Sequence, residues 1–398
     1  MKKIKIFVCF LFFSSCISNN NRTPQKEEEG AMPELPYHIS LENAIGNIKP
    51  AELSEVGSSI TYIPLETVSE SLLKEIRRVI VTDSYFIVND ALVFDSAGNF
   101  LRQIGRKGQG PGEYSMFIGD VFLSFDKNKL YLLVETSKVL EYTIEGKFLN
   151  SYKLDSIPCM ILPIKDDLFV YYCRNATRNP IGQSLVISDL NNNIQKTYKN
   201  YHKRIRKSGI DIFLTFAPFY IYQENIRFKE FGCDTLFTVT EEDLIPYCIL
   251  DLGKRKIPVD FSVNNPLRFI EEVGAQEEYP SMYWISKIVE DVDNLYITLS
   301  DFKNDLYGFI NKKTQVVKVI GDQGFRNDID GGLPFFPINS HHDSILVGHI
   351  NAFDLREHVL NSNAAEMKRL YGQKHDDLVK FANSIDDESN PIIVLVKK

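Results

Sequence analysis

Apolar residues come in short runs with period-two alternation from Ser58 onward, and turn residues separate the runs. Such runs are typical of β-strands. They group in sets of four, and the sets begin near residues 76, 120, 160, 216 and 284. A spacing of about 40 residues with four strands in each set is typical of β-propeller blades. A turn rich in Asp, Asn and Gly precedes the outer strand of the first three sets, at residues 95–98, 144–146 and 189–192. These residue types tolerate positive φ, so the turns support the same interpretation.

The sixth set is interrupted. Two strands are expected at 334–338 and 344–350, a helical apolar period follows over 351–385, and an apolar strand is expected at 391–396. The missing outer strand is available near the other end of the chain, at 59–65. Pairing this strand into the last blade would close the ring and remove two open edges. The pattern therefore predicts an all-β, six-bladed propeller of four-stranded blades, with five or seven blades as alternatives.

The N-terminus has the features of an export signal. Lys2, Lys3 and Lys5 precede a short apolar run at 6–13, which is too short to span a bilayer. Ser14 and Ser15 then precede Cys16, as at a bacterial lipoprotein cleavage site. We expect a signal peptide over 1–15, a lipid on Cys16, a flexible tether over 16–57 and the propeller over 58–398. The alternative is an ordinary secretory signal with an incidental cysteine.

Composition fits a large β domain. Of the 398 residues, 44% are hydrophobic and 12% aromatic, which is enough for a substantial core, and aromatic residues favour strands. The formal net charge is −8 and no long basic block occurs, so nucleic acid is not an expected partner. Beyond Cys16 the chain has Cys159, Cys173, Cys233 and Cys248. We favour buried thiols over a disulfide, for which Cys233 and Cys248 would be candidates.

The connections between strands differ in length on the two faces of the predicted ring. Connections within the hairpins that start each blade are short, whereas the crossings between blades are long, at 105–117, 199–215, 251–283 and 321–333. The connection at 174–183 and the helical segment fall on the same side. Long loops on a rigid scaffold often hold binding residues. The alternative is that they only cover blade edges.

The long loops supply the candidate ligand-binding residues, which are charged or aromatic. They are Arg106, Lys107, Glu113, Tyr114, Tyr279, Arg326, Asp328 and Asp330.

Motifs for cofactor chemistry are weak. The glycines at 105–110 resemble a phosphate loop, but Pro111 and Gly112 follow where a helix would have to begin. The run His341-His342-Asp343, with His349, is a possible metal cluster, and Asp328 with Asp330 could contribute to a calcium site, but convergence of enough ligands is not evident. No catalytic or metal-binding residue is nominated, and a divalent metal such as calcium remains only a possible cofactor.

Several segments resemble those of the six-bladed β-propeller lipoproteins of Gram-negative gut bacteria, which have relatives of NHL-repeat type. They are residues 63–67 (IPLET), 94–98 (FDSAG), 108–114 (GQGPGEY), 327–332 (NDIDGG) and the pair Asn390-Pro391. The resemblance implies a propeller fold and a location in the cell envelope. It implies no catalytic residues.

The expected function is therefore that of a lipid-anchored binding or scaffold protein, located at the outer membrane and attached to it only through its lipid. Its partner would be a glycan, a peptide or an envelope protein, engaged on the long-loop face at the channel mouth. The alternative is a propeller enzyme, a lyase or a lactonase-type hydrolase with a metal in the central channel.

Overall fold

The computed structural model describes residues 35–173, 182–200, 216–257, 282–301 and 303–398. All of them belong to one compact unit, Pro33–Lys398. Cys16 and Tyr279 lie outside the described residues.

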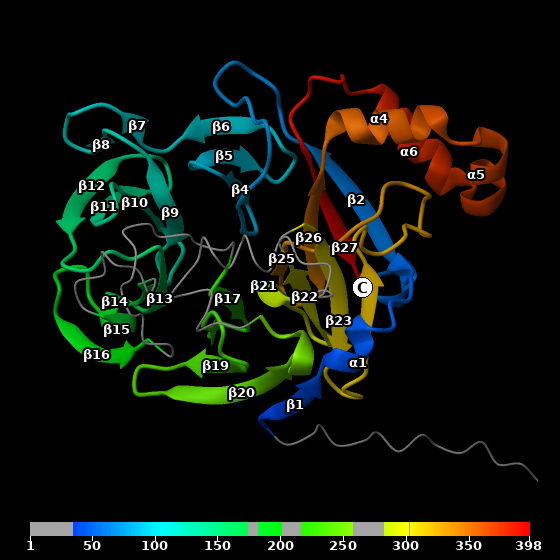
Figure 1. Ribbon diagram of the computed structural model, residues 1–398. Helices are drawn as coiled ribbons and strands as arrows, with labels where there is room; N and C mark the ends of the chain where they lie inside the picture. The colour runs from blue at the N-terminus through cyan, green and yellow to red at the C-terminus, as the bar shows by residue number, and fades with distance from the viewer. Residues whose placement is uncertain (1–34, 174–181, 201–215, 258–281, 302) are drawn as a thin grey trace, which may run out of the picture. The chain divides into compact units, whose positions relative to one another are not determined.

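Five of the blades contain four antiparallel strands that are consecutive in the chain (Figure 1). Blade 1 contains β3 (Val79–Val81), β4 (Tyr85–Val88), β5 (Leu92–Asp95) and β6 (Phe100–Gln103). Blade 2 contains β9 (Ile118–Leu123), β10 (Lys129–Val134), β11 (Lys138–Thr143) and β12 (Phe148–Lys153). Blade 3 contains β13 (Met160–Lys165), β14 (Leu168–Tyr172), β15 (Gln183–Ser188) and β16 (Ile194–Lys199). Blade 4 contains β17 (Phe219–Tyr222), β18 (Asn225–Lys229), β19 (Thr235–Val239) and β20 (Leu244–Asp251). Blade 5 contains β21 (Trp284–Glu290), β22 (Asn294–Ser300), β23 (Asp305–Asn311) and β24 (Val317–Gly321).

Blade 6 is assembled from both ends of the chain. Its sheet order is β25 (Asn339–His341), β26 (Ile345–Ile350), β27 (Ile392–Lys397) and β2 (Ser59–Pro64). β2 pairs antiparallel with β27 from Ser59 opposite Lys397 to Pro64 opposite Ile392. The predicted six-bladed fold with closure by an N-terminal strand is therefore confirmed.

The hydrophobic core is arranged as a series of clusters around the ring of blades. A separate hydrophobic cluster lies between each pair of neighbouring blades, including blades 6 and 1, where Val347 and Ile393 pack with Val79 and Phe94. The middle strands face a neighbouring blade on both sides, so that β14 and β22 are buried along their whole length. The outer strand β12 is largely exposed. This explains why middle strands are continuously apolar whereas outer strands are polar.

Residues 35–57 are folded, which corrects this part of the tether predicted over 16–57, whereas residues 16–34 lie outside the described residues. β1 (Tyr37–Ser40) adds to blade 4 as a fifth strand, parallel to β20. α1 (Glu42–Ile45) and the 3-10 helix η1 (Leu53–Glu55) follow, and Leu41 and Leu53 are fully buried. The segment is ordered because its alternating apolar residues cover the outer edges of blades 4 and 5.

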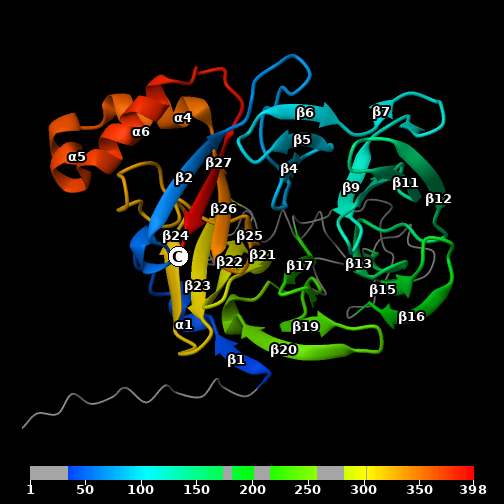
Figure 2. The same cartoon turned by 180° about the vertical axis from the view of Figure 1, so that it is seen from behind.

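The insertion between β26 and β27 contains α4 (Ala352–Asn361), α5 (Ala364–Tyr371) and α6 (Gln373–Asn383), as the helical period over 351–385 predicted (Figures 1 and 2). Ala352 and Leu355 of α4 pack against Leu378 and Ala382 of α6. Among the described residues no helix has the length and apolar character needed to cross a bilayer.

Two smaller features complete the fold. The strands β7 (Arg106–Lys107) and β8 (Glu113–Tyr114) form a two-stranded sheet in the loop after blade 1, and the 3-10 helix η2 (Gly253–Arg255) follows β20. Cys159, Cys173, Cys233 and Cys248 are all free thiols. Burial raises the pKa of the Cys173 and Cys248 thiols to about 12, so they remain protonated, apolar core residues.

Candidate functional site

The glycine-rich loop crosses from β6 to β9 and is held by Glu113. The carboxylate of Glu113 accepts hydrogen bonds from the backbone N–H of Gly110 at 2.8 Å and from Nε of Arg106 at 2.5 Å. The N–H of Gly110 and the guanidinium of Arg106 lower the pKa of Glu113. Glu113 therefore stabilises the loop through hydrogen bonds within the loop itself. This agrees with the interpretation that the glycines serve the backbone geometry of the crossing and not phosphate binding.

Two further residues of this loop, Gly112 and Tyr114, attach it to the core. Tyr114 is buried between blades 1 and 2. Gly112 has φ +73°, and a Cβ there would lie 2.6 Å from the ring of Phe148, so glycine is required on both counts. The hydroxyl of Tyr142 donates to the carbonyl of Gly112. Lys107 is exposed.

The candidates in the loop between blades 5 and 6 contact the N-terminal segment. Arg326 donates from Nε and Nη2 to Oε1 of Glu52, at 3.0 and 2.5 Å. Asp328 accepts the backbone N–H and the hydroxyl of Ser54, at 2.9 and 2.5 Å.

Asp330 is buried within that loop. Its Oδ1 accepts the N–H of Gly332 at 2.9 Å, the amide of Asn327 at 2.7 Å and the hydroxyl of Tyr62 at 3.3 Å. Burial raises the pKa of Asp330, and these donors oppose that rise. The predicted motif at 327–332 is thus a hydrogen-bonded turn that joins β2 to the loop.

The described candidates fall into two groups. Arg106, Lys107, Glu113 and Tyr114 occupy the loop between blades 1 and 2, whereas Arg326, Asp328 and Asp330 occupy the loop between blades 5 and 6. No hydrogen bond or ion pair joins the two groups among the described residues. Ligand binding by these residues stays a prediction.

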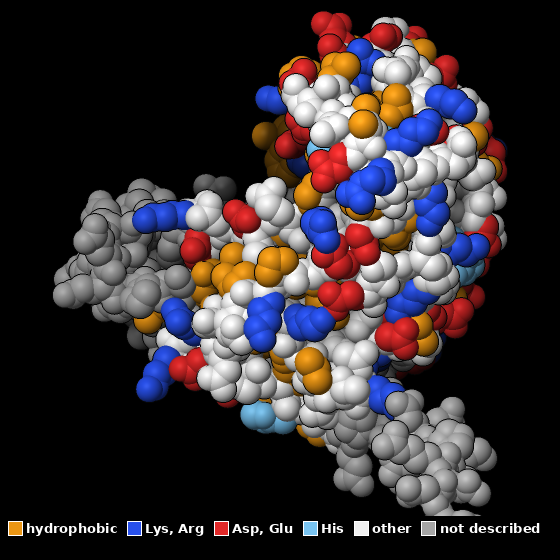
Figure 3. Space-filling view, turned by 90° about the vertical axis from the view of Figure 1, so that its right-hand side faces the viewer, with side chains coloured by type: hydrophobic (Ala, Val, Ile, Leu, Met, Phe, Trp, Pro, Cys, Tyr) orange, Lys and Arg blue, Asp and Glu red, His pale blue; other side chains and the backbone are white. Residues whose placement is uncertain are grey.

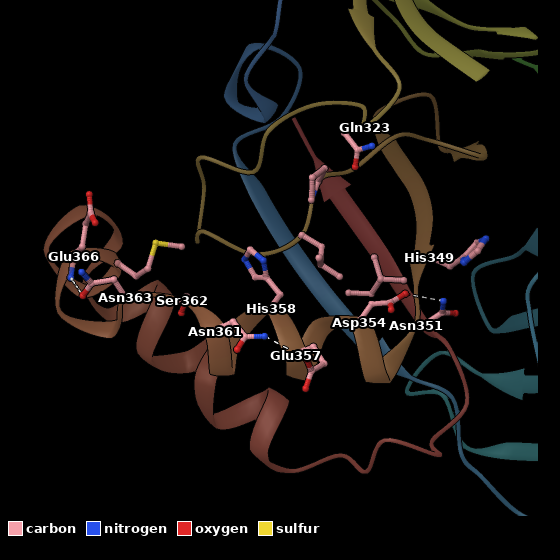
Figure 4. Close-up of a pocket in the computed structure, with 14 residues that line it drawn as sticks. Gln323, His349, Asn351, Asp354, Glu357, His358, Asn361, Ser362, Asn363 and Glu366 are labelled. Carbon is pink, nitrogen blue, oxygen red and sulfur yellow. Dashed lines mark hydrogen bonds between the residues drawn. The ribbon is translucent and has the colours of Figure 1, made fainter. Parts of the chain in front are cut away.

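A cavity of about 790 Å³ lies beside the helical insertion (Figure 4). It is formed by the loop after β24, the end of β26, α4 and the start of α5. Its lining residues are Gln323, Leu333, Pro334, His349, Ile350, Asn351, Asp354, Glu357, His358, Asn361, Ser362, Asn363, Glu366 and Met367. A crossing between blades and the helical insertion therefore do meet on one side of the ring.

The spacing of residues in α4 explains the polar wall of this cavity. Asp354, Glu357, His358 and Asn361 lie at positions i, i+3, i+4 and i+7, which share one face of a helix. Leu355 points to the core instead.

Two histidines attach the insertion to the loop after β24. His358 Nε2 lies 2.9 Å from the carbonyl oxygen of Gly331, and His375 Nδ1 lies 3.1 Å from that of Asp330. These contacts hold α4 and α6 against the loop, so the cavity is positioned by the same turn that Asp330 stabilises.

The cavity is acidic. Asp354, Glu357 and Glu366 line it, and no Lys or Arg is among the lining residues. Asn351 donates to Asp354 at 2.8 Å and Asn361 donates to Glu357 at 3.2 Å. Nδ1 of His349 is buried and has no hydrogen-bond partner among the described residues, and burial lowers the pKa of this imidazole. The sequence predicted the helices but not the cavity, because the cavity wall combines residues from four segments of the chain.

A second set of buried charges lies between blades 4 and 5, around the fully buried Glu290. Its carboxylate accepts the hydroxyls of Tyr247 and Tyr220, at 2.6 and 2.8 Å, and Nζ of Lys312 at 3.1 Å, while Nε of Arg227 lies at 3.5 Å. Because every charge has a partner, this network fits a structural role.

Within the described parts of the chain, one group of three side chains has its ligand atoms close enough to hold a metal ion, namely Asp83, His341 and His342. Asp328 and Asp330, which the sequence suggested for calcium, do not belong to such a group, since their carboxylates hold Ser54 and the turn at 330–332.

The fold defines a six-bladed β-propeller. The chain belongs to the family described as "Domain of unknown function (DUF4934)", whose model matches residues 36–397. A Bacteroides fragilis NCTC 9343 chain named as an exported protein has a similar structure, with a TM-score of 0.70, 20% identity, and coverage of 91% of this chain and 100% of that one.

Other solved structures are more distant. BamB from Moraxella catarrhalis has a TM-score of 0.36 at 11% identity, over 66% of this chain and 64% of that one. The β-propeller domain of Cps50 (Swd1) from Myceliophteria thermophila has a TM-score of 0.39 at 9% identity, over 73% and 95%. No curated protein matches the sequence.

Proposed function

We propose that this propeller is a binding protein of the cell envelope, and that the cavity beside α4 holds a basic peptide segment of a partner protein. The observation that carries the proposal is the acidic cavity itself. Asp354, Glu357 and Glu366 line a volume of about 790 Å³ that no Lys or Arg lines. Carboxylates in a concave site attract cationic groups and repel phosphates and acidic glycans.

The remaining lining residues suit a peptide. The amides of Gln323, Asn351 and Asn363 both donate and accept hydrogen bonds, as a peptide backbone requires. Leu333 and Met367 provide apolar contacts for the stems of Lys and Arg side chains.

A neighbouring strip of α4 also favours a protein partner. Phe353 and Leu360 are seven positions apart, lie on one edge of the helix and are exposed. Apolar and aromatic side chains beside a polar rim are typical of protein interfaces. On the face shown in Figure 3, basic and acidic side chains are intermixed.

Binding is testable with peptide pairs. Lys- and Arg-containing peptides should bind the protein in fluorescence anisotropy, and the same peptides with Gln at those positions should bind at least tenfold more weakly. Affinity should also fall as salt is added, because exposed charge pairs are screened. Equal binding of the basic and Gln peptides would contradict the proposal.

A matched variant tests the location. Combined Asp354→Asn, Glu357→Gln and Glu366→Gln changes remove the charges and keep the side-chain shapes. We expect at least a tenfold loss of peptide affinity with an unchanged melting temperature. Glu242→Gln, in the exposed β19–β20 turn, should bind as the unchanged protein does. The same loss in Glu242→Gln would point to a general charge effect instead.

The location in the envelope is part of the proposal. Lys2, Lys3 and Lys5, the apolar run at 6–13 and the small residues before Cys16 support export and lipidation at Cys16. The similar Bacteroides fragilis structure is of a chain named as exported, which agrees with this. We place the lipid-anchored protein at the outer membrane, and we propose that its propeller is related to the NHL-repeat type. Cys16→Ala should abolish fatty-acid labelling and release the protein from the membrane fraction.

A further inference from the structure

Residues from the first and last blades of the ring meet at the face opposite the helical insertion. Asp83 lies in the turn between β3 and β4 of blade 1. His341 ends β25 of blade 6, and His342 begins the turn that follows. In a propeller, the turns between first and second strands open on the side opposite the crossings between blades. The three residues therefore gather through ring closure and not through proximity in the sequence.

Both imidazoles point to the same carboxylate oxygen. Nε2 of His342 lies 2.6 Å and Nε2 of His341 lies 3.2 Å from Oδ1 of Asp83. The two rings are 3.9 Å apart between centroids. All three ligand atoms lie within 4.8 Å of one another.

These distances are close to those of a metal site. With Zn–N and Zn–O bonds of about 2.0–2.2 Å, ligand atoms of a tetrahedral ion lie roughly 3.3 Å apart. Small side-chain rotations would move the three atoms to that spacing. The side chains of Asp83 and His342 are 75% and 61% exposed, so an ion can enter from solvent, whereas that of His341 is 15% exposed and is held by its strand.

We propose that Asp83, His341 and His342 form a binding site for a divalent transition-metal ion of the zinc class, which links blade 6 to blade 1. Two imidazole nitrogens and one carboxylate oxygen suit Zn²⁺, Cu²⁺, Ni²⁺ or Co²⁺, whereas Ca²⁺ and Mg²⁺ prefer oxygen ligands only. Three protein ligands leave at least one coordination position for water or for an anion.

A simple ion pair explains the arrangement less well. One imidazole is enough to pair with a carboxylate, and the second ring lies beside the first where two protonated rings would repel each other. His342 has φ +48°, a left-handed conformation that both His and Asn adopt more often than most residues do.

Lys127, in the turn between β9 and β10, is close enough to act electrostatically on Asp83 and His341. Its charge weakens cation binding and favours an anionic group at the open coordination position. The acidic cavity beside α4 shares no residue with this site, so the inference stands independently of the proposed peptide binding.

Equilibrium dialysis with Zn²⁺ alone tests the site. The full mature chain is stripped with chelator, dialysed against Zn²⁺, and its metal content is measured by elemental analysis. We expect one Zn²⁺ per chain with a micromolar or lower Kd. His341→Ala, His342→Asn and Asp83→Asn should each weaken binding about tenfold or more.

His342→Asn is the sharpest of these variants, because Asn keeps the turn and removes the imidazole. Its melting temperature without metal should match or exceed that of the unchanged protein, so a loss of binding cannot come from misfolding. Co²⁺ should produce a visible absorption band in the unchanged protein and not in His342→Asn.

The exposed His38 of β1 provides the matched control. His38→Gln should bind Zn²⁺ as the unchanged protein does. The proposal is overturned if no stoichiometric Zn²⁺ is retained at 1 mM free metal, a concentration about a thousandfold above a micromolar Kd. It is also overturned if His342→Asn binds Zn²⁺ as tightly as the unchanged chain.

Discussion

Arg326 and Glu52 are separated by 274 positions in the chain, and the guanidinium of Arg326 donates twice to one carboxylate oxygen of Glu52, at 3.0 and 2.5 Å. The backbone joins the same segments, since the N–H of Leu53 donates to the carbonyl of Arg326 at 2.8 Å. The loop that supplied three candidate ligand residues thus holds the N-terminal segment on the ring.

The Arg326–Glu52 pair should contribute little to stability despite its geometry. The side chains are 68% and 33% exposed, and exposed pairs typically contribute about 0.2–1 kcal/mol. We expect a double-mutant cycle of Arg326→Ala and Glu52→Ala in urea unfolding to give a coupling free energy below about 1 kcal/mol. A coupling of several kcal/mol would mean that the loop and the N-terminal segment unfold as one unit through this contact.

Asp330 should contribute more to the free energy of unfolding than the Arg326–Glu52 pair does. Asp330→Ala removes one buried acceptor from Gly332, Asn327 and Tyr62, and a buried polar group left without a partner costs about 1–3 kcal/mol. We expect a loss of at least that size in the free energy of unfolding. Asp328→Ala, which affects the exposed contact with Ser54, is the control and should cost less. Equal effects would contradict the role assigned to the buried turn.

Substitution of Leu53 tests whether the N-terminal segment before β2 is folded onto the propeller. The side chain of Leu53 is fully buried among residues of blades 5 and 6, so Leu53→Ala should lower the free energy of unfolding by about 2–5 kcal/mol. The exposed Ile48 of the same segment gives the comparison, since Ile48→Ala removes no buried contact. If both variants were equally stable, the segment would not be part of the folded unit in solution.

Asp120 should make stability depend on pH. Burial raises the pKa of this carboxyl to about 6, against the opposing effects of Arg78 and of the N–H groups of Ile161 and Val121. Between pH 4 and pH 6 the folded state therefore binds a proton that the unfolded state has lost. Stability from this group falls as pH rises through that window, by roughly 2–3 kcal/mol, and is constant above it.

The measurement compares Asp120→Asn with the unchanged protein in urea at several pH values. The difference in free energy of unfolding should shift in favour of the unchanged protein as pH is lowered from 7 to 4. Asp166→Asn, at an exposed turn residue, should show no such trend. A difference independent of pH would mean that the pKa of Asp120 is the same in the folded and unfolded states, and would contradict the raised pKa.

Much of the fold could be predicted because each blade is a local structure. Period-two alternation and turn residues specify hairpins over spans of about 40 residues, and the helical period over 351–385 is equally local. The closure by residues 59–65 could be predicted as well, since an unpaired edge at one end of the chain matched a spare strand at the other. The segment with Tyr37 and Ile39 was missed because four alternating residues are too short to identify a strand that adds to an existing sheet.

The sites were decided by the tertiary structure. Sequence marked Glu113, Arg326 and Asp330 as charged loop residues, but only the fold shows that their hydrogen-bond partners are Gly110, Glu52 and Gly332. His341 and His342 were visible as a pair, whereas Asp83 joins them only because ring closure places blade 1 beside blade 6. Local patterns determine which strands and helices form, while a site needs side chains from distant elements at distances of a few ångströms, and those distances are set by packing around the whole ring.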